Sequence, residues 1–126
     1  MTDDGLLAEL LSDTRAVVRQ LLEEPVGGPE VLWAAVDAAR ARIAERSDPS
    51  ADTALAEALA DRCAAWLGRW GELDGGAQRL VQVAVRYFAL DADGDDDWVS
   101  VFGFDDDREV LDAIARRLGE PAIEAP

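Results

Sequence analysis

The sequence predicts an all-α protein, folded as a single compact bundle of about five helices. Apolar residues recur three or four positions apart through five segments of the 126-residue chain. Pro, Gly or Asp residues bound these segments, as helix start and stop signals do. Apolar and polar residues nowhere alternate as in a half-buried strand. We therefore expect one helical domain over residues 1–119 and a flexible tail over residues 120–126.

The first two predicted helices lie on either side of a Pro- and Gly-rich break. Residues 6–22 place their apolar side chains on one continuous arc of the helical wheel. Pro25 and Gly27–Gly28 then interrupt the chain. Pro29 suits the first turn of a second helix that runs to about Arg46. The apolar positions on this second helix are Leu32, Val36, Ala39 and Ile43.

Two further helices are predicted around a Gly- and Asp-containing turn. Asp48–Pro49 opens the third helix, which we expect to end near Gly71. Its predicted buried stripe consists of Leu55, Leu59, Cys63, Trp66, Leu67 and Trp70. Asp74 can cap a fourth helix that runs to about Leu90. Its apolar arc is the widest, so we expect this helix at the centre of the bundle.

The fifth predicted helix begins near Asp105 or Asp106 and ends at Gly119, with Pro121 beyond. Asp107 falls near the middle of its apolar arc. A carboxylate at such a position needs compensation because burying it alone is costly. The candidate partners are backbone N–H groups of its own first turn, Arg79 or Arg86 on the preceding helix, and a cation.

The charge of the chain limits its partners and its chemistry. The formal net charge is −15, all 12 basic residues are arginines, and histidine is absent. Such a chain repels nucleic acid and anionic lipid and favours a basic protein or a cation. Without histidine, neither Ser-His or Cys-His catalysis nor a His-ligated metal is possible. An enzyme would depend on carboxylates, Arg, Tyr87 or Cys63, so enzymatic activity is the less favoured interpretation. A GC-rich genome or a salty host offers a general alternative explanation of the composition.

The N-terminal residues and the single cysteine favour a cytoplasmic location. Residues 1–11 carry acids where a secretory signal would carry basic residues. No apolar run approaches the roughly 20 residues of a membrane span. One cysteine allows no internal disulfide, which fits a reducing environment. We expect a cytoplasmic protein without a membrane association.

The segment 91–112 concentrates the negative charge. It holds ten acids and one arginine, for a net charge of −9. Carboxylates two positions apart repel one another, so helix ends, arginines, an exposed loop or a bound cation should offset them. No cofactor is required, but Ca²⁺ or Mg²⁺ is a possible ligand. The candidate metal ligands are Asp91, Asp93, Asp95, Asp97, Asp106 and Asp107. An EF-hand is excluded, because Asp96 and Phe102 occupy the positions that need Gly and Glu. The alternative is a polar latch in which Asp93, Asp97, Asp106 and Asp107 fix the loop to helix ends.

The same segment resembles a known family. Tyr87, Asp93, Asp97, Trp98, Gly103 and the pair Asp106–Asp107 match, without gaps, the motif of the YkvA-like domain of unknown function. The resemblance covers about the last third of the chain and implies a small helical domain, mostly bacterial, without an established activity. Where the motif has Pro before its second Asp, this chain has Asp96. Where the motif has apolar residues between its first two Asp positions, this chain has Gly94 and Asp95. The loop is therefore more polar than the motif.

These observations favour a non-enzymatic interaction or accessory domain that binds a protein partner through its acidic C-terminal end. The alternative is a divalent-cation-binding helical domain that uses the Asp-rich loop. An edge tryptophan beside alanines, Trp33, could anchor an interface, since Trp is enriched at binding hot spots. The expected partner-binding residues are Asp95, Asp96, Trp98, Phe102 and Trp33.

Overall fold

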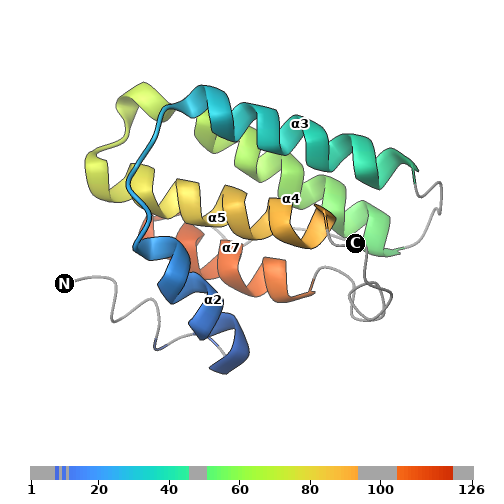
Figure 1. The fold of residues 1–126 in the computed structure, drawn as a ribbon, viewed down its shortest axis with the longest axis horizontal. Helices are drawn as coiled ribbons and strands as arrows, with labels where there is room; N and C mark the ends of the chain where they lie inside the picture. Colours follow the sequence, from blue (N-terminus) through green and yellow to red (C-terminus); the bar gives the residue numbers. More distant parts are fainter. Residues whose placement is uncertain (1–7, 9, 11, 46–50, 94–104, 121–126) are drawn as a thin grey trace.

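A computed structural model of the chain describes residues 8, 10, 12–45, 51–93 and 105–120 (Figure 1). These residues contain five α-helices and no strand, which confirms the all-α prediction for this part of the chain. The helices are α2 (Ser12–Leu22), α3 (Pro29–Glu45), α4 (Ala51–Gly68), α5 (Gly75–Asp93) and α7 (Asp105–Arg117). None of the described helices is both long and apolar enough to cross a membrane.

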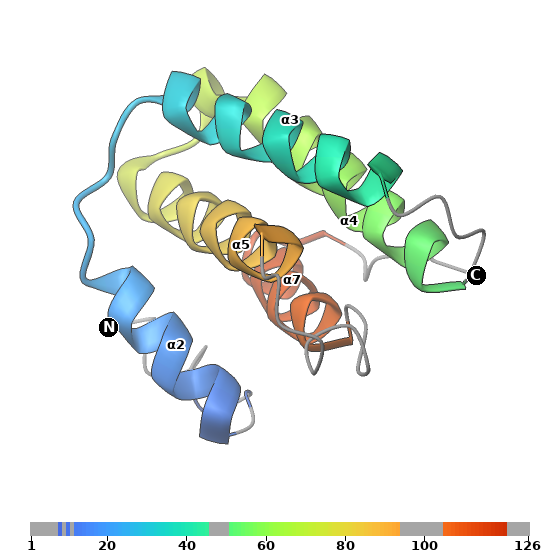
Figure 2. The same cartoon turned by 45° about the vertical axis from the view of Figure 1, so that its right-hand side comes forward.

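Helix α5 is the centre of the bundle, as its wide apolar arc predicts. It packs against each of the other four α-helices. In Figure 2, α3 and α4 lie side by side on one side of α5, α7 lies beneath it, and α2 covers a further side. The helix has buried residues around most of its circumference because neighbours surround it. Its fully buried residues include Val81, Val83, Ala84, Val85 and Phe88.

The predicted apolar faces form the core, with differences at their edges. All four predicted positions of α3 are buried, and so are five of the six on the α4 stripe. Trp70, the sixth, is only partly buried. On α2, Val18 is completely buried whereas Val17 remains 36% exposed. Helix α2 packs mainly on α5, and a single neighbour covers a narrower stripe than the arc on its wheel.

The start of α5 follows its predicted cap, whereas the ends of α4 and α5 differ from expectation. The backbone N–H of Ala77 donates to the Asp74 Oδ1 over 2.8 Å, which satisfies a donor of the first turn. The regular part of α4 ends at Gly68, and a 3₁₀ turn over Trp70–Glu72 leads into α5. Helix α5 continues to Asp93, three residues beyond its expected end. The predicted start of α4 at Asp48–Pro49 lies outside the described residues.

Helix α7 ends in a Schellman motif. Gly119 has φ +77°, a conformation that glycine adopts without the penalty of a Cβ. The N–H of Glu120 donates to the Ala115 carbonyl over 2.8 Å, and that of Gly119 donates to the Arg116 carbonyl over 3.1 Å. These bonds reverse the chain and direct Glu120 back along the bundle.

Two polar side chains of α5, here called the α5 clamp, hold the connection between α2 and α3. The amide of Gln82, a residue only 3% exposed, donates to the Pro25 carbonyl and accepts from the Gly27 N–H, both over 3.0 Å. One turn earlier, Arg79 donates to the carbonyls of Leu22 and Glu24. Residues 23–28 of this connection lie outside the helices, and these side chains supply hydrogen bonds to their backbone.

Candidate functional site

The two ends of the acidic segment come together at one end of the bundle. Asp91 and Asp93 belong to the last turn of α5, and Asp105 and Asp106 to the first turn of α7. Helices α5 and α7 pack together, and both views place these two helix ends next to each other (Figures 1 and 2). The other predicted residues of this segment, Asp95, Asp96, Asp97, Trp98 and Phe102, lie outside the described residues.

Asp107 is completely buried, as its place on the helical wheel predicts. It lies near enough to Cys63 on α4 for its negative charge to act on that thiol. The two arginines considered as its partners both bind the α2–α3 connection: Arg79 through backbone carbonyls and Arg86 through Glu24, 3.6 Å away. Asp107 is therefore part of the interior between α4 and α7, away from the outer surface of the acidic end.

Cys63 is an unreactive core thiol. Its side chain is completely buried. Burial raises the pKa of Cys63 well above its usual value, the charge of Asp107 raises it further, and Arg40 lowers it in part. Because the thiolate is the nucleophile, a thiol held in its protonated form does not attack a substrate.

Two further polar contacts lie near the start of α7. The Thr14 hydroxyl donates to Glu109 Oε1 over 3.4 Å and so joins α2 to α7. Arg108 and Asp112 form an ion pair over 3.8 Å along α7. Among the described residues there is no group of three or more Cys, Asp or Glu side chains that could hold a metal ion. Two of the six predicted ligands, Asp95 and Asp97, lie outside the described residues.

Trp33 is half-buried and packs against the core from α3. It lies in the same helix as several exposed alanines, as expected for a residue at the edge of an apolar face.

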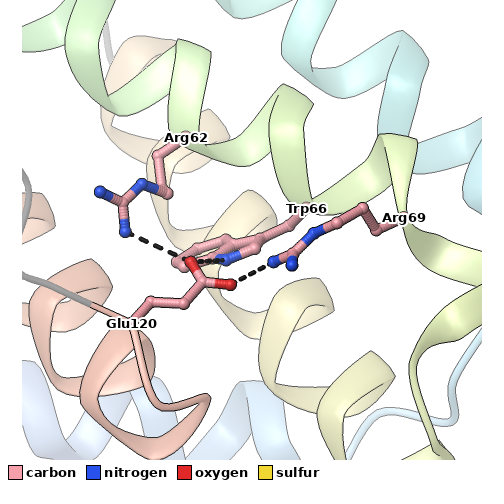
Figure 3. Close-up of polar contacts among 4 residues, drawn as sticks. All are labelled: Arg62, Trp66, Arg69 and Glu120. Atoms are coloured by element: carbon pink, nitrogen blue, oxygen red, sulfur yellow. Dashed lines mark hydrogen bonds and ion pairs between the residues drawn. The ribbon is translucent and has the colours of Figure 1, made fainter.

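The most developed polar site in the described chain lies elsewhere, between α4 and Glu120, three residues beyond the end of α7. Three donors, which we call the Arg–Trp–Arg cluster (Arg62, Trp66 and Arg69), converge on the carboxylate of Glu120 (Figure 3). The Trp66 Nε1–H donates to Oε1 over 2.9 Å, and Arg62 reaches the same oxygen over 3.4 Å. Arg69 donates to Oε2. Both oxygens of Glu120 therefore have donors, two of which are charged.

The cluster is buried on the side that faces the core. Trp66 is completely buried, and its indole N–H points to Glu120. Arg62 lies over the Trp66 ring, with its guanidinium carbon 5.8 Å from the ring centroid, a cation–π arrangement. The side chains of Arg62 and Glu120 are 20% and 22% exposed, whereas that of Arg69 is 47% exposed. The cluster is thus anchored on its inner side and open to solvent at Arg69.

The donors of the cluster lower the pKa of the Glu120 carboxyl. Partial burial on its own would raise the pKa of this carboxyl. The hydrogen bonds from Trp66 and Arg69, together with the charges of Arg69 and Arg62, outweigh burial and hold the pKa below its usual value of 4.5. Glu120 is consequently a carboxylate at neutral pH.

This cluster was not predicted from the sequence. A flexible tail was expected over residues 120–126, whereas the Schellman motif and three side-chain donors hold Glu120 in place. Residues 121–126 lie outside the described part. The spacing of Arg62, Trp66 and Arg69 puts all three on one helical face, which was an available signal. Their acceptor is 51–58 residues away along the chain, so no local pattern could identify it.

A shallow hollow of about 290 Å³ lies between α3 and α4. An ion pair between Arg40 and Asp61, 2.7 Å long, spans it, and Ile43, Ala44 and Glu57 complete its lining. The pair is well exposed, with 41% and 76% of the two side chains accessible to solvent. Exposed pairs of this kind add little stability.

Comparison with known proteins adds no identification. No family model matches the chain, and searches of curated proteins and of solved structures return no match. The resemblance to the YkvA-like domain therefore rests on the motif between Tyr87 and Asp107 alone.

Proposed function

We propose that this chain is a non-enzymatic helical interaction domain that binds a basic protein partner through its acidic end, residues 91–112. The observation that carries the proposal is the packing of α5 against α7, which brings the two ends of a segment with net charge −9 to one end of the bundle. Charge gathered in this way steers a basic partner and speeds association more than it tightens the final complex.

The arginines of the chain support a basic partner. Many of the described ones are engaged within the fold: Arg62 and Arg69 with Glu120, Arg79 with backbone carbonyls, Arg86 with Glu24, and Arg108 with Asp112. Positive charge is used to hold the bundle together, while acids are in large excess over the chain as a whole. A partner recognised by charge would then carry Lys or Arg.

The surface of the acidic end can be tested with a matched pair of charge variants. Asp95→Asn with Asp96→Asn removes two charges from the proposed interface. Asp37→Asn with Glu45→Gln removes two charges from exposed positions on α3. A partner is first captured from lysate by the unmodified chain, identified and purified, and its binding to each variant is then measured by surface plasmon resonance.

We expect the first variant to slow association by about two- to fivefold at low salt, and the α3 variant to leave it nearly unchanged. The difference between them should shrink as salt is added, because salt screens exposed charges. Equal association rates for both variants at low salt would contradict the proposal.

A further inference from the structure

The Arg–Trp–Arg cluster directs three hydrogen-bond donors toward one carboxylate. Charged donors bind a carboxylate most strongly, above all when both of its oxygens accept hydrogen bonds. Here two guanidinium groups and an indole N–H donate to the two oxygens of Glu120. In a chain of net charge −15, this gathering of positive charge around a single acceptor is a local reversal of sign.

Two of the three donors have contacts apart from Glu120. Trp66 is completely buried in the core, and Arg62 lies over its indole ring. A receptor whose groups are already ordered spends little entropy on binding a ligand. Trp66 and Arg62 should therefore keep their positions after the carboxylate has left.

Glu120, in contrast, lies at the margin of the fold. It is the first residue after Gly119, outside the last helix, and its backbone N–H donates to the Ala115 carbonyl to close the Schellman motif. The open side of the cluster is at Arg69, which is 47% exposed. A carboxylate from solution could enter from this side.

We propose that Arg62, Trp66 and Arg69 form a carboxylate-binding site that Glu120 fills from within the same chain, and that the site accepts an external carboxylate once Glu120 is displaced. This site is separate from the acidic end and does not depend on the proposed function. Its ligand is a carboxylate group, carried either by a small organic acid or by an acidic side chain of a peptide.

The test empties the site with Glu120→Ala and follows the indole N–H resonances by ¹⁵N–¹H NMR. Two probes distinguish the sources of the ligand: acetate, and a blocked Gly-Glu-Pro tripeptide that carries the same side chain as Glu120. Chloride replaces each probe at equal ionic strength. The Trp33 indole, on α3, is the internal reference, and the dispersed spectrum shows that the variant is folded.

In Glu120→Ala, the Trp66 resonance should shift in a saturable manner, with a dissociation constant on the order of millimolar. The unmodified chain should show no such shift at the same concentrations, because its tethered carboxylate competes at a high effective concentration. Saturation by acetate would identify a site for the carboxylate alone. Saturation by the tripeptide only would identify a peptide site, and either result supports the proposal.

Two double variants locate the binding. Adding Arg69→Ala to Glu120→Ala should weaken binding by about two- to threefold, because an exposed charged donor is lost. Adding Arg40→Ala, which removes a guanidinium paired with Asp61 outside the cluster, should leave it unchanged. If neither probe shifts the Trp66 resonance, or if both double variants bind equally, the proposal is overturned.

Discussion

The α5 clamp and the Arg–Trp–Arg cluster both fasten a connecting segment to the bundle, but they bind different groups. Gln82 and Arg79 bind backbone carbonyls and an N–H of the α2–α3 connection, whatever side chains that connection carries. The cluster on α4 binds the charged side chain of a single residue, Glu120. Backbone groups do not titrate, whereas a carboxylate does. One contact should therefore be permanent and the other conditional on pH and salt.

The largest effect is expected at the α5 clamp. Gln82→Leu keeps the size of the side chain but removes two hydrogen bonds and leaves the Pro25 carbonyl and Gly27 N–H without them. We expect a loss of about 2 kcal/mol in the free energy of unfolding, measured by urea denaturation. The loss should be the same at acid and neutral pH. Gln20→Leu, an exposed position on α2, serves as the control and should stay within about 0.5 kcal/mol of the unmodified chain. A similar small effect for Gln82→Leu would show that the clamp is dispensable.

A smaller and pH-dependent effect is expected at Glu120. Its pKa is lowered in the folded protein, so its stabilisation is present above the usual carboxyl pKa and disappears as the pH falls through the lowered folded value. Glu120→Ala should thus cost about 1 to 1.5 kcal/mol at neutral pH and almost nothing in strong acid. Urea titrations of both proteins across this range measure the difference. A cost that is independent of pH would mean that the contact acts through packing alone.

The smallest effect is expected within the cluster, at its open side. Arg69 is 47% exposed and should contribute about 0.5 kcal/mol, most of it removed by 1 M salt. Arg62 is 20% exposed and also stacks on Trp66, so Arg62→Gln should cost more than Arg69→Gln and be less sensitive to salt. Thermal denaturation at low and high salt gives both values. The reverse order would show that stacking and burial at Arg62 add nothing.

The contrast also explains what could be predicted from sequence. Periodicity identified the faces of α3 and α4 and the central place of α5, because burial of a helical stripe leaves a regular signal. The Asp74 cap and the Gly119 ending were also predictable, since both depend on residues close in sequence. Glu120 was assigned to a tail because its partners belong to another helix. The same holds for Gln82, whose partners lie 55 and 57 residues away.

For the acidic end, the charge could be read from the sequence, and the structure adds the proximity of the end of α5 to the start of α7. The burial of Asp107 was predicted from the wheel of α7. Its proximity to Cys63 was not, because it depends on how α4 and α7 pack.

The burial of Cys63 has a practical consequence. It is the single thiol of the chain and lies completely inside the bundle, in a protonated state favoured by its surroundings. A thiol-directed reagent can reach it only in molecules whose interior has briefly opened. The rate at which such a reagent labels Cys63 in the native protein therefore measures how often the core opens.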